Sequence, residues 1–229
     1  MPDDLATLAQ PEFTLVAWAA GLAFAAGLVG VLRVVGPGFT WMAGSLAGLL
    51  GLTGLFGEAT WWARFGLILV ALGLIWARNR QLSGIFLITA GLALAAQASQ
   101  IGGWAPAISA TLALGGVSAE MLLGHWYLVD PRLPRWTLKG LVIAGVAGLV
   151  ADASVLAIAG LPASGGTTVF WILMVTSVAL MGAVFASLRY PAYSGVMAAT
   201  GLSYLAVLTT LGGVFVGRLL VAGLGPFTS

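Results

Sequence analysis

Apolar runs of 17 to 25 residues follow one another along the whole chain, separated only by short stretches rich in Gly, Pro and charge. A helix that crosses the hydrocarbon core of a bilayer needs about 20 such residues. Only 7% of the chain is charged, against roughly 25% in soluble domains. We therefore predict an all-α fold, a polytopic helical bundle embedded in a membrane. About eight spans are expected, at residues 13–35, 39–56, 61–77, 82–98, 106–129, 137–159, 167–189 and 192–216.

The connections between these runs are too short for an extramembrane domain, so residues 1–229 are expected to form one bundle. Eight spans also permit a four-plus-four arrangement of residues 1–100 and 101–229. The two halves show no convincing match in sequence, so this division is a hypothesis that rests on the span count alone.

Basic residues gather in alternate connections. One side of the predicted bundle has Arg33, Arg78, Arg80, Arg132, Arg135, Lys139 and Arg189, whereas the other has only Arg64 and Arg218. The positive-inside rule makes the first side cytoplasmic, which leaves both termini outside the cytoplasm, and the acidic start of the chain, with Asp3 and Asp4, is compatible with this. The expected location is a bacterial cytoplasmic (inner) membrane. Membrane topology explains the net charge of +2, so the charge gives no reason to expect nucleic acid as a partner. The expected partners are lipid, other membrane subunits or a second copy of the chain.

The residue counts exclude several kinds of site. The chain has no Cys and one His, so a zinc cluster or a bis-histidine haem within one chain is excluded and no metal site is predicted. Its single lysine, Lys139, lies near a helix end, which excludes a mid-membrane retinal Schiff base. Neither a phosphate-binding loop nor a nucleophile elbow is present. We predict no catalytic residues, and enzymatic activity is not favoured.

Glu120 is the deepest acidic residue. It lies ten residues before Asp130, about 15 Å along a helix from the cytoplasmic boundary. A stripe of small and polar residues at helical spacing includes it: Ser109, Ala113, Gly116, Glu120, Gly124 and Tyr127. Burial of a carboxylate disfavours its charged form, so Glu120 is a candidate proton or substrate site. Tyr127, Gln97 and Tyr204 are candidates to line a path to it; a purely structural, hydrogen-bonded Glu120 is the alternative.

Asp152 is expected in the outer half of the membrane, about 22 Å from the cytoplasmic end of its span. Because pairing is the least costly way to retain a charge in lipid, we predict a structural ion pair between Asp152 and Arg64. Arg64 lies in the first turn of a span at the same outer side.

His125 and Trp126 lie one to two turns from the cytoplasmic boundary. An imidazole there is a candidate cofactor ligand, to a haem or to a quinone carbonyl, or a proton relay. The alternative is an interfacial His and an aromatic belt. The identity of any cofactor stays unknown from sequence.

The connection that follows contains two prolines and a dense group of cations. Arg132, Arg135 and Lys139 are candidates for contact with anionic lipid or a partner, although topology alone also explains their charge.

Three functions fit these residues. The first is a small transporter or channel-like protein that uses the protonatable Glu120, and the second is a membrane subunit of a redox or energy-transducing complex that binds quinone or haem near His125. The third is a non-catalytic membrane scaffold. We expect the first, because a deep carboxyl lies in a compact bundle without a soluble domain.

Overall fold

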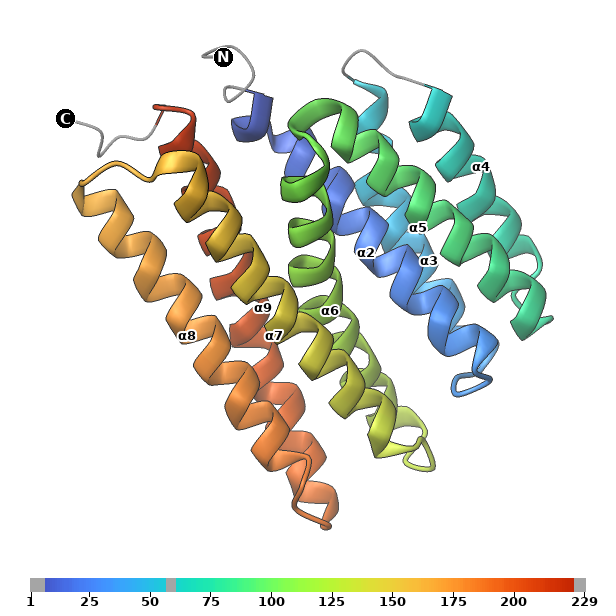
Figure 1. Ribbon diagram of the computed structural model, residues 1–229. Helices are drawn as coiled ribbons and strands as arrows, with labels where there is room; N and C mark the ends of the chain where they lie inside the picture. Colours follow the sequence, from blue (N-terminus) through green and yellow to red (C-terminus); the bar gives the residue numbers. More distant parts are fainter. Residues whose placement is uncertain (1–6, 57–60, 225–229) are drawn as a thin grey trace.

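The computed structural model describes residues 7–56 and 61–224, and every regular element in these ranges is helical. Eight α-helices and two short 3₁₀ segments follow in chain order (Figure 1). They are η1 Thr7–Ala9, α2 Pro11–Val31, α3 Pro37–Gly51, η2 Leu52–Leu55, α4 Trp61–Ile75, α5 Arg80–Gly102, α6 Trp104–Val129, α7 Arg135–Gly160, α8 Gly165–Ser187 and α9 Tyr193–Val221. The all-α prediction is confirmed for the described residues. Asp3, Asp4 and Glu58 lie outside them.

Helix boundaries follow the local chemistry. Pro37 stands in the first turn of α3, where its missing N–H costs nothing. The side chain of Asn79 caps α5 by accepting a hydrogen bond from the N–H of Leu82 at 3.2 Å. Between α5 and α6 there is one residue, Gly103, with φ of 84°. Because a residue with a Cβ is strained at this positive φ, the tight reversal between α5 and α6 requires glycine.

Seven helical segments among the described residues are long and apolar enough to cross a membrane, so the chain is a multi-pass membrane protein by helix length and composition. The segment Pro37–Leu55 counts as one of them, because η2 continues α3. Helix α4 has 15 residues, about 22 Å at 1.5 Å per residue, short of the roughly 30 Å hydrocarbon core. The eight predicted runs are therefore all helical, but one of them is shorter than a full span.

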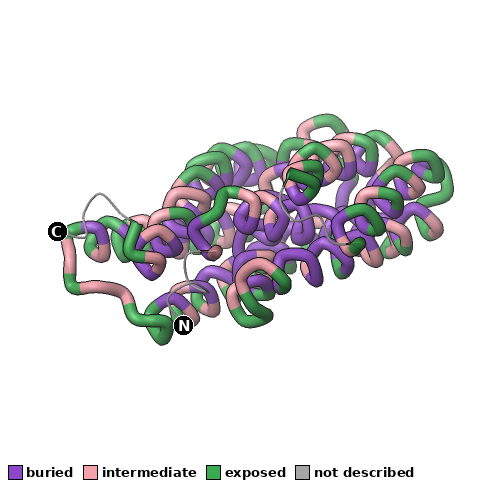
Figure 2. The backbone as a smooth tube through the Cα atoms, turned by 90° about the horizontal axis from the view of Figure 1, so that it is seen from above, coloured by how far each residue is buried: buried purple, intermediate pink, exposed green. Residues whose placement is uncertain are grey.

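The helices pack as two groups of four, α2–α5 and α6–α9, whose main contact is between α2 and α6. In the first group α2 packs on α3 and α5, and α4 packs on α3 and α5; in the second, α6 packs on α7 and α9, and α8 packs on α7 and α9. In both groups, therefore, the first and third helices each pack on the second and the fourth. The division of the chain into residues 1–100 and 101–229 stays a hypothesis, and so does a duplication of the sequence. Buried residues lie along the inside of the bundle and exposed ones on its outer surface (Figure 2).

Helices α2 and α6 cross at two glycines. A Cβ on Gly21 would lie 2.5 Å from Cα of Gly115, and one on Gly115 would lie 2.3 Å from Cα of Gly21. Real side chains do not approach so closely, so both positions need glycine for this contact. Close backbone approach at small residues is the usual basis of helix association in lipid.

The two ends of the bundle differ in charge. At the end that we call the arginine-rich end lie the connections α2–α3, α4–α5, α6–α7 and α8–α9, with six arginines in or beside them: Arg33, Arg78, Arg80, Arg132, Arg135 and Arg189. At the opposite end, the termini end, α2 begins and α9 ends (Figure 1). That the arginine-rich end faces the cytoplasm stays a prediction.

Candidate functional site

Glu120 lies at the contact between α6 and α9 and is fully buried. Its Oε2 forms a hydrogen bond with Oγ of Ser203 on α9, and the same Oγ lies 2.7 Å from the carbonyl oxygen of Ala199. A serine hydroxyl has one hydrogen to donate. Both contacts are satisfied together when a protonated Glu120 donates to Ser203 Oγ and Ser203 donates to the Ala199 carbonyl.

The second carboxyl oxygen of Glu120 has no hydrogen-bond partner. It lies near Gly124, where a Cβ would be 3.8 Å from Oε1 and 2.8 Å from Oγ1 of Thr200. The missing side chain of Gly124 therefore lets the hydroxyl of Thr200 pack closely against α6, near the carboxyl. Buried polar atoms are nearly always hydrogen-bonded, so Oε1 is one of the few exceptions among the described residues.

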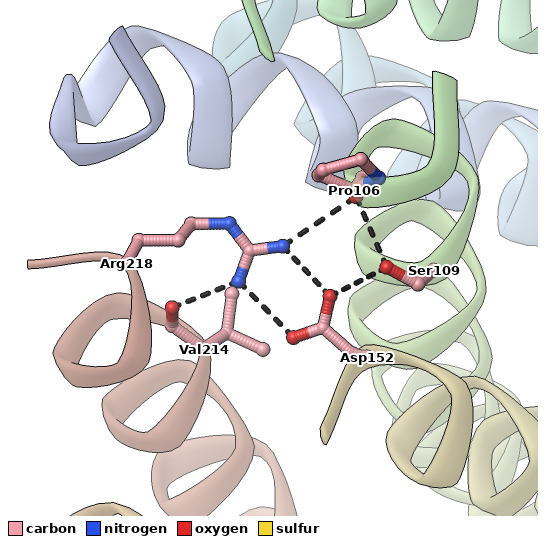
Figure 3. A network of polar contacts seen from close by, with 5 residues as sticks. All are labelled: Pro106, Ser109, Asp152, Val214 and Arg218. Carbon is pink, nitrogen blue, oxygen red and sulfur yellow. Dashed lines mark hydrogen bonds and ion pairs between the residues drawn. The ribbon is translucent and has the colours of Figure 1, made fainter. Parts of the chain in front are cut away.

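A buried ion pair lies nearer the termini end, between Asp152 of α7 and Arg218 of α9 (Figure 3). The guanidinium is bidentate, with Nη2 at 2.7 Å from Oδ1 and Nη1 at 3.1 Å from Oδ2. Ser109 of α6 donates to Asp152 Oδ1 at 2.7 Å. Arg218 also donates to the carbonyls of Val214 at 2.8 Å and Pro106 at 3.5 Å. Both charged side chains have no exposed surface. A pair removed from water in this way is retained only when hydrogen bonds satisfy most of its polar atoms, and here the exception is Arg218 Nε.

The guanidinium also lies over an aromatic ring. The Cζ of Arg218 is 5.1 Å from the centre of the Phe13 ring of α2, a distance at which a cation is attracted to the ring face. Through this contact the ion pair joins α2 of the first half to α6, α7 and α9 of the second.

These groups form what we call the polar column: Thr200, Ser203, Thr210 and Arg218 on α9, Glu120 and Ser109 on α6, and Asp152 on α7, all of them buried. From Thr200 to Arg218 the column follows α9 for 18 residues, about 27 Å at 1.5 Å per residue. That length is close to the roughly 30 Å thickness of the hydrocarbon core. The C-terminal half thus contains buried polar groups at successive depths across the bundle.

Buried polar atoms without a partner are concentrated on this column. Among the described residues, six buried side-chain polar atoms have no hydrogen-bond partner. Three of the six belong to the polar column: Glu120 Oε1, Thr210 Oγ1 and Arg218 Nε. Internal water commonly satisfies groups of this kind, so the column has the donors and acceptors needed to hold water.

The other predicted path residues do not gather around Glu120. Tyr127 is buried on α6, seven residues after Glu120 and on the same helix face. Gln97 is buried in α5 of the first half, where its Cγ would lie 3.9 Å from a Cβ on Gly54. Tyr204 is 46% exposed on the outer surface of α9. Only Tyr127 shares a helix face with the candidate proton site.

His125 and Trp126 lie on different faces of α6. His125 is exposed, and its Nδ1 is 3.2 Å from the hydroxyl of Tyr204, a contact whose donor depends on the tautomer. Trp126 packs edge-on against Phe39 of α3, with ring centres 6.3 Å apart. The two predicted cofactor contacts therefore do not form one site.

The predicted ion pair between Asp152 and Arg64 is wrong. Arg64 is exposed on α4, in the other half of the bundle. The sequence prediction ended the last span at residue 216, whereas α9 continues to Val221 and brings Arg218 into the core. The sequence does contain a signal for the correct partner. Apolar residues continue on both sides of Arg218, and an arginine inside such a run needs a buried partner.

The predicted contact residues of the α6–α7 connection are mostly engaged within the chain. Arg132 pairs with Asp130 at 3.1 Å, and this hydrogen bond lowers the pKa of the Asp130 carboxyl below its usual value. Arg135 donates to the carbonyls of Tyr190, Pro191 and Ala192 in the α8–α9 connection. Lys139 is half-buried on α7.

Comparison of the chain with family models, with curated proteins and with solved structures gives no match. Within residues 7–56 and 61–224, no group of three metal-binding side chains gathers in one place.

Proposed function

We propose that this protein is a small channel-like membrane transporter that moves protons through its C-terminal half, with Glu120 as the exchange site. The observation that supports this most is the arrangement at Glu120. One carboxyl oxygen contacts Ser203, whose single hydroxyl hydrogen favours a protonated acid, and the other oxygen is unpartnered beside a glycine.

The polar column supplies the route. On the arginine-rich side of Glu120, the hydroxyl of Thr200 packs against Gly124, one turn of α6 after Glu120. On the other side Thr210 has an unpartnered hydroxyl, two turns of α9 after Ser203. Water held between these groups would carry a proton to and from Glu120, because each hydroxyl can both donate and accept.

The Asp152–Arg218 pair closes the column near the termini end. A fixed guanidinium repels a passing proton. The Arg218 and Asp152 side chains, held together by two hydrogen bonds, lie between α6, α7 and α9. In this proposal the pair is a gate, and a proton passes when water separates the two side chains.

The test is proton flux into liposomes that contain the purified protein and a trapped pH-sensitive dye, driven by a potassium diffusion potential. We expect wild-type flux clearly above that of protein-free liposomes, and Glu120→Gln flux reduced at least about tenfold, because glutamine cannot exchange a proton. Glutamine keeps the shape and can hydrogen-bond Ser203, so folding should be retained. The matched control is Glu12→Gln, the same change at the first turn of α2.

Unchanged flux in Glu120→Gln contradicts a role of Glu120. Wild-type flux equal to that of empty liposomes contradicts proton movement altogether. Equal losses in Glu120→Gln and Glu12→Gln would contradict a specific role of Glu120.

The His125–Tyr204 hydrogen bond favours a second candidate function, a quinone site in a redox subunit. Both side chains are exposed on the outer surface of the bundle, where a lipid-soluble quinone could offer a carbonyl to them. In this case quinone should be extracted from natively purified wild-type protein and lost in His125→Ala. A folded wild-type preparation without quinone contradicts this candidate.

A further inference from the structure

Three arginines from two connections line one hollow at the arginine-rich end of the first half. Arg33 follows α2, Arg78 precedes α5, and Arg80 is the first residue of α5. Together with Asn79 and Gln81 they line a pocket of about 480 Å³. Arg80 Nη1 donates to the Arg33 carbonyl at 3.4 Å and so joins the two connections.

The charge of this arginine pocket, defined as Arg33, Arg78 and Arg80, has no counterion within the described part of the chain. The ion pairs there are Arg132 with Asp130 and Arg218 with Asp152. All three arginines of the pocket are exposed. The N-terminal end of α5 adds its partial positive charge to the same place.

The equivalent arginines of the second half are different, and they provide an internal comparison. Arg132 pairs with a carboxylate, Arg135 binds three carbonyls, and the Cζ of Arg189 lies 5.0 Å from the centre of the Phe185 ring. Membrane topology requires positive charge at this end, but it does not require three arginines to line one hollow without a carboxylate partner among the described residues. The arginine pocket therefore needs an explanation beyond topology.

The backbone at Arg33 gives independent support. Helix α2 ends in a Schellman motif, in which Arg33 N–H donates to the Gly30 carbonyl and Val34 N–H to the Val29 carbonyl. Arg33 takes a left-handed conformation, with φ of 57°, at the position where glycine is preferred. The same motif at the end of α9 has Gly223 there, with φ of 70°. An arginine therefore stands where the turn favours glycine, which points to a use for its side chain.

We propose that Arg33, Arg78 and Arg80 form a binding site for the phosphate group of an anionic ligand at the membrane boundary. Guanidinium groups bind phosphate oxygens in a bidentate manner, and the hollow is open at the end of the bundle. Trp76, which lies in the α4–α5 connection and is 48% exposed, is typical of the headgroup region. The phosphate belongs either to a phospholipid headgroup or to a free phosphate. This site is separate from the polar column and does not depend on proton movement.

Two measurements on the full-length protein test the proposal and separate the two sources. In the first, native mass spectrometry counts the lipids retained from nanodiscs that contain phosphatidylglycerol or phosphatidylcholine. In the second, calorimetry titrates inorganic phosphate into delipidated protein in detergent at constant ionic strength. Retention of phosphatidylglycerol alone identifies a headgroup site, and phosphate binding without lipid identifies a free-phosphate site.

The variant Arg33→Gly/Arg78→Gln removes two charges from the pocket and leaves the Schellman turn with its preferred residue. We expect it to lower retention of phosphatidylglycerol or phosphate affinity at least about tenfold, since a lost charge-assisted hydrogen bond from a guanidinium to phosphate costs about a factor of ten or more. The control, Arg132→Gln/Arg189→Gln, removes two charges from the same end and should change binding less than twofold.

Equal losses in both double variants would overturn the proposal, because a general surface potential would then be the cause. So would a wild-type protein that neither prefers phosphatidylglycerol nor binds phosphate.

Discussion

Arg218 and Asp152 show what residue-level reasoning can predict for this chain. The cost of a lone charge in lipid predicted that Asp152 needs a basic partner, and it has one. The partner was wrong, because the sequence does not show which helices are neighbours: α7 lies beside α9, while α4 lies in the other half. Likewise the helical stripe predicted the burial of Glu120, but its partner, Ser203, is 83 residues away.

The ion pair makes a prediction for stability. Arg218→Met leaves Asp152 buried without its cation, so the free energy of unfolding should fall by about 3–5 kcal/mol, whereas Asp152→Leu/Arg218→Met should recover most of the loss. Arg64→Gln, at the exposed arginine, should cost less than about 0.5 kcal/mol. Equilibrium unfolding in mixed detergent and SDS micelles measures all three variants. Equal costs for Arg218→Met and Arg64→Gln would contradict the assigned pairing.

At the scale of single elements, the length of each apolar run predicted the positions of all eight α-helices of the described residues. A run that lies in lipid must form a helix, because only then are its backbone hydrogen bonds satisfied within the segment. The ends were less accurate: α5 and α9 continue four and five residues beyond residues 98 and 216. Helices at these positions extend past the apolar run because neighbouring helices cover their last turns. Gly102, for example, lies against Leu8 and Phe13.

The α2–α6 crossing makes a prediction at this scale. Gly21→Ala places a methyl group 2.2 Å from the Thr111 carbonyl oxygen, so the helices must separate, at a cost of about 1–3 kcal/mol. Gly201→Ala, on α9 with nothing within 4 Å of the new Cβ, should be neutral or slightly stabilising because alanine favours helix. Thermal unfolding in detergent compares the two. A Gly21→Ala protein as stable as Gly201→Ala would show that the close contact is absent.

For the whole molecule, the charge distribution predicted which connections share an end, and the structure gathers six arginines there. The packing of the two halves was not predictable, since their sequences do not match while their helix contacts do. Packing in lipid depends on where small residues lie, and Gly21 opposite Gly115 fixes the contact between halves without any long sequence motif.

Orientation can be measured directly, because the chain has no cysteine. We expect Gln81→Cys, in the arginine-rich end, to react with a membrane-impermeant maleimide only after cells are permeabilised. Ala163→Cys, in the α7–α8 connection, should react in intact cells. Both residues are exposed, so access to the reagent depends on the side of the membrane. The reverse pattern would contradict the predicted topology.

The most direct test of the central claim asks whether the buried Glu120 exchanges its proton. Infrared difference spectra of the protein in lipid, recorded in H₂O and in D₂O, report the carbonyl stretch of a protonated carboxyl. We predict a band that shifts in D₂O and that is missing in Glu120→Gln but present in Glu12→Gln. A band that does not shift, or that survives in Glu120→Gln, would contradict Glu120 as a proton-exchange site and leave it a structural carboxyl.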